Sequence, residues 1–249
     1  MHLQTAPSLQ LYSVRRQFDA DPLGTLQRVA DLGYESVELV GFAGRAEYLA
    51  RLLAETGLRA VSGHAHLLDA PDVPAILRDA ALLGLEAVID PAIGREHWAT
   101  GPDIERSASR FTAVADLAET AGLLIGYHNH EWELQSTIGD RSGLEVFAGA
   151  LDPRVVLEVD TFWAEVGGVS APALLTRLGS RVRYLHMKDG PRTRDMMTQV
   201  PLGQGTLDVP AIISAAPTAH LIVEFDDHDG DIFEAVDASR RFIAEGEAR

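Results

Sequence analysis

The chain has 249 residues and no cysteine, which excludes disulfides, thiolate metal sites and a cysteine nucleophile. Its formal charge of −16 disfavours nucleic acids and anionic membranes as partners, because both are bound largely by Lys and Arg set against phosphates. Hydrophobic residues make up 46% and charged residues 23%, as in ordinary soluble globular proteins. Residues 1–7 do not resemble a signal peptide, and no apolar run is long enough to span a membrane. We therefore expect a cytoplasmic protein with one domain over residues 1–249.

Apolar, strand-like runs alternate with amphipathic helical stretches along the chain. The first run, at 8–11, precedes a helix that begins at the N-cap pair Asp21-Pro22 and continues through Leu32. Four later runs each follow a glycine placed where the end of a helix needs a left-handed residue. These glycines are Gly33, Gly57, Gly84 and Gly122, before runs at 36–39, 60–62, 87–89 and 124–127. Further runs at 155–159, 182–185 and 221–223 bring the number of predicted strands to eight.

This alternation predicts an α/β fold with a parallel sheet. Eight units in this length favour a single closed (β/α)8 TIM barrel over a doubly wound sheet, and no Gly-x-Gly-x-x-Gly follows the first run. The longest irregular stretch, at 188–208, follows the seventh predicted strand. We expect it to be a loop that covers the substrate.

Polar residues follow four successive predicted strands, at the end of the barrel where such folds carry their active sites. Carboxylate and imidazole groups are the ligands of Mg, Mn, Co and Zn, and a bound cation relieves the repulsion between clustered carboxylates. The sequence therefore predicts one divalent metal at the C-terminal mouth of the barrel. The polar residues are His128, Asn129, His130 and Glu131 after the fifth run, Glu158 and Asp160 in the sixth, His186 and Lys188 after the seventh, and Glu224, Asp226 and Asp227 after the eighth.

Side chains alternate along a strand, so the orientation of residues after the fifth run can be compared. His128 and His130 share one orientation, whereas Asn129 and Glu131 share the other. Only one of these two sets can face the metal.

Six segments of the chain resemble the sugar phosphate isomerase/epimerase family, whose fold is the xylose isomerase-like TIM barrel, and the resemblance covers nearly the whole chain. In the ketose 3-epimerases of that superfamily, Glu, Asp, His and Glu from strands five to eight hold the metal. Three of these positions match Asp160, His186 and Glu224 directly. The segments are LQLYSVR at 9–15, YHNH at 127–130, DTFW at 160–163, LHMKD at 185–189, PLGQG at 201–205 and VE at 223–224.

The chain departs from the epimerase pattern at two positions. His128 occupies the place of the first metal Glu, so we expect His128 to be the fourth ligand, with Glu131 as the alternative. Trp163 stands where ketose epimerases tend to carry a substrate-binding His. Arg192, six residues after His186, falls where those enzymes place an Arg on the substrate oxygens.

Other polar residues are candidates for catalysis or substrate binding. Lys188 could polarise a carbonyl or act as an acid with a lowered pKa, or it could be a rim lysine paired with Asp189. His64 and His66 could contact sugar hydroxyls, and Glu38 could bind substrate or cap a helix. The predicted catalytic residues are Glu224, His128, Lys188 and Glu131, and the predicted substrate-binding residues are Glu38, His64, His66, His130, Trp163 and Arg192.

The resemblance implies one divalent ion, Mn or Mg first and Co or Zn next, and a small-molecule carbohydrate substrate. It further implies isomerisation or epimerisation by removal of the proton beside a carbonyl through an enediolate. With His128 in place of a Glu, β-elimination or dehydration of a 3-keto glycoside or a keto-inositol stays open. The acidic charge counts against the endonuclease chemistry of another branch. A non-catalytic sugar-binding barrel is the alternative of another class, and a homo-oligomer is the usual assembly of such barrels.

Overall fold

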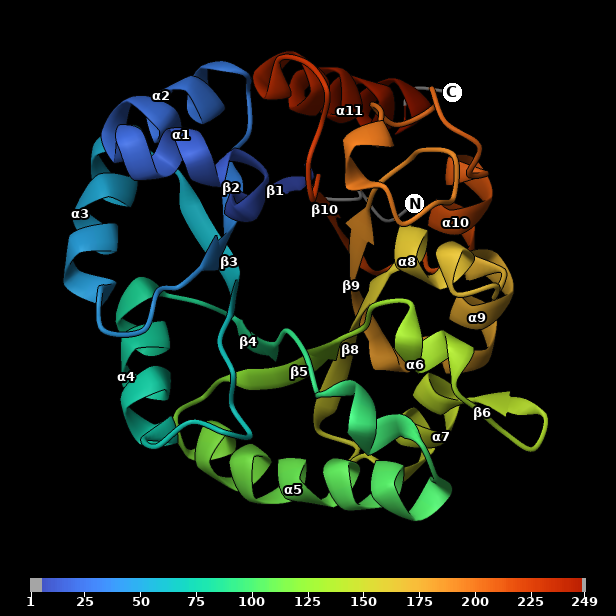
Figure 1. The fold of residues 1–249 in the computed structure, drawn as a ribbon. Coiled ribbons are helices and arrows are strands. Elements are labelled where there is room, and N and C mark those ends of the chain that lie inside the picture. The colour runs from blue at the N-terminus through green and yellow to red at the C-terminus, as the bar shows by residue number, and fades with distance from the viewer. Residues whose placement is uncertain (1–5, 248–249) are drawn as a thin grey trace.

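The computed structural model describes residues 6–247, so most of the segment 1–7 considered above lies outside the described residues. Eight parallel strands form a closed barrel in the order β1-β10-β9-β8-β5-β4-β3-β2, and helices surround it (Figure 1). This confirms the predicted single (β/α)8 TIM barrel. The strands are β1 (Ser8–Gln10), β2 (Ser36–Val40), β3 (Arg59–His64), β4 (Ala87–Asp90), β5 (Leu124–His128), β8 (Val155–Asp160), β9 (Val182–Met187) and β10 (His220–Val223).

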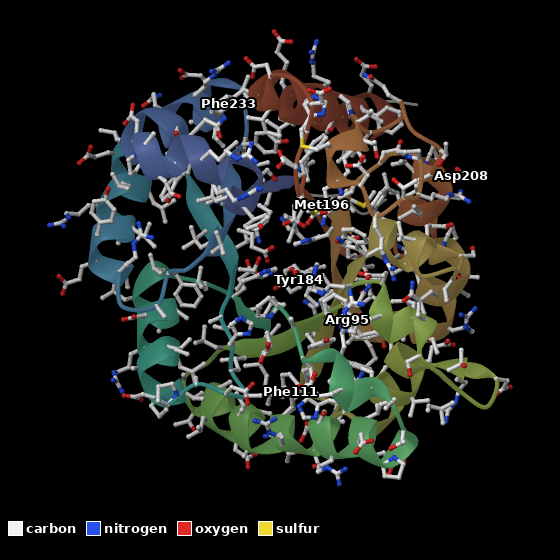
Figure 2. All side chains as sticks on the ribbon, viewed as in Figure 1. Arg95, Phe111, Tyr184, Met196, Asp208 and Phe233 are labelled. Atoms are coloured by element: carbon white, nitrogen blue, oxygen red, sulfur yellow. The ribbon has the colours of Figure 1, made fainter. Side chains whose placement is uncertain are left out.

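The helices on the outside of the barrel bury their apolar faces against the strands. Phe111, for example, is fully buried on the inner face of the longest helix, α5 (Figure 2). The longer helices are α2 (Pro22–Asp31), α3 (Ala46–Thr56), α4 (Val73–Leu83), α5 (Gly101–Thr120), α7 (Gly143–Ala150), α9 (Ala171–Leu178), α10 (Val209–Ala215) and α11 (Ile232–Glu247). Shorter elements are the helices α1 (Arg15–Ala20), α6 (Trp132–Gln135) and α8 (Thr161–Val166), and the hairpin of β6 (Thr137–Ile138) and β7 (Arg141–Ser142).

The local signals in the sequence act as expected. Asp21 caps α2 by accepting a hydrogen bond from the backbone N–H of Gly24. Gly57 and Gly84 end α3 and α4 with φ of 72° and 71°, a conformation that costs glycine little. The first strand is shorter than predicted: it ends at Gln10, whose side chain accepts the N–H of Tyr12 and starts a 3-10 turn at Leu11.

The interior of the barrel changes from apolar to polar toward the C-terminal ends of the strands. A separate apolar cluster that includes Val156, Tyr184 and Ile222 fills one layer (Figure 2 labels Tyr184). Because every second residue of a strand faces the same way, Glu158 and His186 lie in the next layer. Both are fully buried, and Asp160 follows at the mouth. The fold thus places ionisable side chains above an apolar floor.

None of the helices within residues 6–247 has both the length and the apolar composition needed to cross a membrane.

Candidate metal centre

The ammonium of Lys188 lies among three carboxylates at the ends of β8 and β10. Its Nζ is 2.7 Å from Oδ2 of Asp160, 2.8 Å from Oε2 of Glu224 and 2.9 Å from Oδ2 of Asp226. Lys188 is 2% exposed and is the only lysine in the chain. An ammonium is a compact charge with three donors, which matches three carboxylate oxygens. These oxygens therefore define one buried position for a cation.

Asp160, His186 and Glu224, three predicted metal ligands, meet beside this position. Their ligand atoms lie within 4.8 Å of one another, and all three side chains are buried. Nδ1 of His186 is 2.6 Å from Oε2 of Glu224. Oδ2 of Asp160 accepts no well-directed hydrogen bond from any residue in 6–247, although Lys188 is near. Two carboxylates and an imidazole suit a hard or borderline divalent ion, so the donor set fits the expected metal.

His128, expected as the fourth ligand, lies at the border of this group. Its Nε2 is 3.9 Å from Oδ2 of Asp160, whereas its Nδ1 is 3.1 Å from Oε1 of Glu158. The ligand atoms of His128, His64, Glu158 and His186 lie within 4.8 Å of one another, so His128 belongs to the layer below. Its role as a metal ligand stays a prediction.

Glu38 belongs to the buried layer and does not line a cavity. Its Oε1 is 2.7 Å from Nε2 of His186 and accepts a hydrogen bond from Gln10 at 2.8 Å. Ser62 donates a hydrogen bond to Oε2 at 2.7 Å. Because Glu38 holds Nε2 of His186, the other ring nitrogen points at Glu224. Glu38, expected to bind substrate, is instead placed to orient His186.

His64 and Glu158 form an ion pair in the same layer. Nε2 of His64 is 2.7 Å from Oε1 of Glu158 and 3.3 Å from Oε1 of Glu38. Burial lowers the pKa of His64, but the two carboxylates outweigh burial and raise the pKa to about 10. Burial and Glu38 raise the pKa of Glu158, but His186 and His64 lower it to about 2. The sequence placed Glu158 among the polar residues of the barrel mouth but gave it no role as ligand, catalyst or substrate contact.

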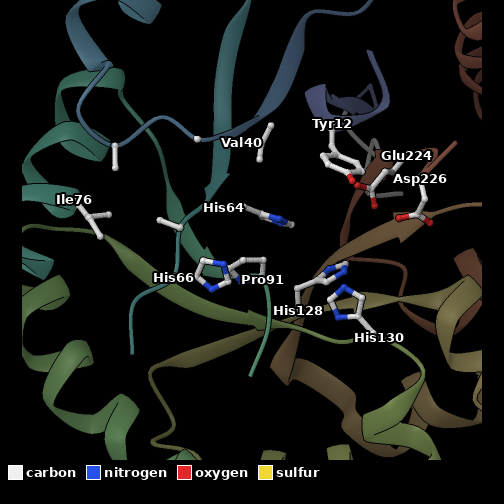
Figure 3. A pocket seen from close by; sticks show the side chains of 13 residues that line it. Tyr12, Val40, His64, His66, Ile76, Pro91, His128, His130, Glu224 and Asp226 are labelled. Carbon is white, nitrogen blue, oxygen red and sulfur yellow. The ribbon is translucent and has the colours of Figure 1, made fainter. Parts of the chain in front are cut away.

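A cavity of about 500 Å³ opens above these residues at the mouth of the barrel (Figure 3). Five of the residues predicted to act on or bind a substrate line it. They are His64, His66, His128, His130 and Glu224.

His130 presents a neutral imidazole to this cavity. Its ring stacks on Trp132 with the centroids 4.2 Å apart. Burial, followed by the charge of Lys188, lowers the pKa of His130 to about 3. Nδ1 is buried without a hydrogen-bond partner among the described residues. His66, in contrast, is exposed at the rim, with Nδ1 3.7 Å from Oδ1 of Asp90.

Residues 26–245 match the model of the xylose isomerase-like TIM barrel family. The chain belongs to this family. The match covers most of the barrel and confirms the resemblance identified in the sequence. No curated protein matches the chain.

Solved structures of low sequence identity share the fold over nearly the whole chain. A sugar phosphate isomerase/epimerase from Parabacteroides distasonis is 21% identical, with a TM-score of 0.79 over 97% of this chain and 94% of that chain. The probable 3-DHS dehydratase AsbF from Bacillus anthracis is 16% identical, with a TM-score of 0.76 over 96% of this chain and 99% of that chain. The IolI protein with a bound zinc atom is 15% identical, with a TM-score of 0.73 over 97% and 98%.

Two residues expected at the site of this xylose isomerase-like barrel lie away from the cavity. The carboxylate of Glu131 is 2.8 Å from Nη2 of Arg95 and 3.2 Å from Nε of Arg194. Arg192 is exposed, pairs with Glu165 at 3.5 Å and donates a hydrogen bond to a backbone carbonyl of its own loop. The structure thus does not bring Glu131 or Arg192 to the cavity, and their roles as alternative ligand and substrate contact stay predictions.

Trp163 and Lys188 also differ from what was expected. Trp163 is buried behind the centre, with Nζ of Lys188 5.8 Å from its ring centroid, and does not line the cavity. Burial lowers the pKa of Lys188, but the carboxylates of Asp160, Asp226 and Glu224 outweigh burial and raise it well above the usual range. The lowered pKa was expected for a lysine beside a bound metal, so it stays a prediction. Lys188 also does not pair with Asp189.

The loop 188–208 is held on the barrel by Asp189 and does not line the cavity. The two carboxylate oxygens of Asp189 accept hydrogen bonds from four backbone N–H groups of this loop, those of Gly190, Gly203, Gly205 and Leu207. None of the residues that line the cavity comes from 189–208. The expected cover over the substrate is therefore not provided by this loop in the structure described.

Proposed function

We propose that this chain is a divalent-metal-dependent carbohydrate isomerase or epimerase. One observation carries the proposal: Asp160, Glu224 and Asp226 converge on a single buried cation position at the edge of a cavity in the barrel mouth. Buried carboxylates are costly unless a cation compensates them, and one ammonium does not balance three. The proposed ligands are Asp160, His186 and Glu224, with His128 as the fourth. Mn or Mg is the first expectation for the ion, with Co or Zn next.

When bound, such an ion polarises a carbonyl and stabilises the negative charge that develops on its oxygen. The chain itself supplies the groups that move protons. Oε2 of Glu224 is held by His186 and Lys188, whereas no described residue is hydrogen-bonded to Oε1. Glu224 lines the cavity, so Oε1 is free to accept the proton beside the carbonyl of a bound sugar.

Isomerisation can proceed with one base that returns the proton to the neighbouring carbon, whereas epimerisation needs a second group that protonates the opposite face. His128 and His130 line the same cavity from β5 and the residues after it, whereas Glu224 follows β10. Lys188 also pairs with Asp226, which lines the cavity, and from there its charge can stabilise an oxygen that becomes negative. The arrangement therefore offers a base and separate imidazoles in one cavity, which suits both isomerisation and epimerisation.

β-Elimination or dehydration is the second candidate function. His64 lines the cavity while its Nε2 lies between the carboxylates of Glu38 and Glu158, so it can hold a proton for a leaving group. A probable dehydratase is among the structures that share this fold. Glu224 as base and His64 as acid would then act on neighbouring carbons.

Proton NMR in deuterated buffer tests both candidates. The protein is stripped of metal, reloaded with Mg²⁺, and incubated with ketoses, 3-keto glycosides and keto-inositols. Deuterium beside the carbonyl together with an isomeric product supports the isomerase, and loss of an aglycone or of water supports the lyase. Asp160→Asn should abolish either reaction. If no substrate exchanges and Asp160→Asn binds metal like the wild type, the proposed site is wrong; binding of sugars without any exchange would point to a sugar-binding barrel.

A further inference from the structure

The cavity at the barrel mouth has two walls of different chemistry. In Figure 3, Ile76 lies at one side and Asp226 at the other, with His64 between them. The wall near Asp226 carries charged and imidazole groups, namely Glu224, Asp226, His128 and His130. The opposite wall comes from α4 and from the residues at and after the ends of β2 and β4. It is formed by Val40, Ala43, Ile76 and Pro91, and His66 lies beside Pro91 (Figure 3).

The cavity is larger than a single sugar ring needs. A hexose has twelve heavy atoms, and at roughly 30 Å³ each, the volume of a water molecule in the liquid, it would fill at most about 360 Å³. The cavity measures about 500 Å³. A sugar whose carbonyl lies beside Glu224 would therefore leave space along the wall that contains Ile76.

That remaining space is bounded by apolar side chains that stay partly exposed, although Ile76 also packs against the core. Val40 is 39% exposed, and Ile76 and Pro91 are only half-buried. Single exposed apolar residues are common, but several that gather along one wall of a cavity mark a surface for an apolar ligand. A hydroxylated ring would gain little from these side chains, because its polar groups would find no hydrogen-bond partner on them.

Tyr12 extends this surface toward the polar wall. It lines the cavity and is 38% exposed, and the guanidinium of Arg15 lies 4.0 Å from its ring centroid. The Arg15 contact holds the ring in place at the rim. The ring of Tyr12 can therefore contact the sugar or its substituent in a ligand that extends from one wall to the other.

We propose that the substrate is a keto sugar that carries an apolar substituent, such as the aryl or alkyl glycoside of a keto sugar, with the substituent against Val40, Ala43, Ile76 and Pro91. This inference rests on the proposed function for the position of the sugar at the metal centre. The further inference specifies that the group attached to the sugar is apolar. The substituent would bind to this wall by burial of apolar surface and would take no part in the reaction.

Isothermal titration calorimetry of the Mg²⁺-loaded full-length protein tests the inference. The probes are phenyl and methyl β-glycosides of glucose and of galactose. Burial of the phenyl ring should make the phenyl glycoside of at least one sugar bind on the order of ten-fold more tightly than its methyl counterpart. Ile76→Asp should remove this difference. Leu82→Asp is the matched control, because Leu82 lies on the same helix but is 53% exposed and does not line the cavity.

The outcomes separate this inference from the proposed function. Equal affinities for phenyl and methyl glycosides, or a preference that Ile76→Asp leaves intact, would overturn the inference. Exchange on free ketoses without binding of any glycoside would also overturn it, while the isomerase proposal would stand. A phenyl preference that depends on Ile76, in a protein that binds no metal and exchanges no proton, would support the inference and overturn the proposed function.

Discussion

The ammonium of Lys188 lies 2.7 Å from Oδ2 of Asp160, one of the proposed metal ligands. The same ammonium is 2.8 Å from Oε2 of Glu224, a second proposed ligand. An ammonium and a metal ion that use the same oxygens repel each other at this distance. We therefore expect Lys188 to compensate the carboxylates when no metal is bound and to shift, for example toward Asp226, when one binds.

Lys188→Met should bind Mg²⁺ or Mn²⁺ at least ten-fold more tightly than the wild type, because the competing charge is removed. Without metal, the same variant should lose about 3–5 kcal/mol of stability, because it leaves buried carboxylates uncompensated. Calorimetric titration with Mn²⁺ and urea unfolding with and without metal measure the two effects. Arg177→Met, which removes a cation from an exposed ion pair with Glu145, is the control.

The only lysine of the chain also allows a direct observation of this shift. In protein labelled with ¹³C-lysine, a single side-chain signal should move when Mg²⁺ is added. A signal that stays in place while Mg²⁺ binds would contradict the competition between Lys188 and the metal.

Glu38→Gln should weaken metal binding by roughly 10–100-fold, although Glu38 is not a proposed ligand. The amide no longer offers a charged acceptor to Nε2 of His186, so the ring is less firmly oriented toward Glu224. The measurement is the Kd for Mn²⁺. Glu86→Gln, a change at an exposed glutamate, should leave the Kd unaltered. A Glu38→Gln variant with wild-type affinity would show that His186 needs no such support.

Tyr127→Phe should lower the free energy of unfolding by about 1–3 kcal/mol, because it removes a donor from a buried carboxyl group. The hydroxyl of Tyr127 donates a hydrogen bond of 2.6 Å to Glu133, and both side chains are fully buried. Urea unfolding measures the loss. Tyr184→Phe is the matched control in the same barrel, since its hydroxyl makes no hydrogen bond within residues 6–247 and its removal should cost much less.

Glu133 should make the protein less stable as the pH rises from about 5 to 8. Burial raises the pKa of Glu133 to about 8, whereas the unfolded chain has an ordinary value near 4.3. Between these values the folded protein binds the extra proton, so stability decreases with pH by at most about 1.4 kcal/mol per unit. Unfolding of wild type and Glu133→Gln at several pH values should show a steeper decline in the wild type. Parallel curves would contradict the raised pKa.

The sequence by itself determined the barrel and the main members of the candidate site. The signals for the fold are local: Gly57 and Gly84 end helices, Asp21 starts one, and apolar runs mark the strands. Parallel strands of a closed barrel end at the same rim, so strand ends predicted that the polar residues of four strands would meet there. That inference needs only the period of a strand and the order of the elements, whereas the choice of Asp160, His186 and Glu224 as ligands came from the family resemblance.

Only the tertiary structure decided how the ionisable side chains pair. Glu38 reaches His186 across the barrel, from a strand about 150 residues earlier in the chain, and sequence spacing says nothing about such a contact. The long side chains of Lys188 and Glu131 turn toward whichever opposite charges the fold brings near, three carboxylates for Lys188 and two arginines for Glu131. The backbone pattern is set by local conformational preferences, whereas the charges of a buried site are arranged by neighbours that meet only when the barrel closes.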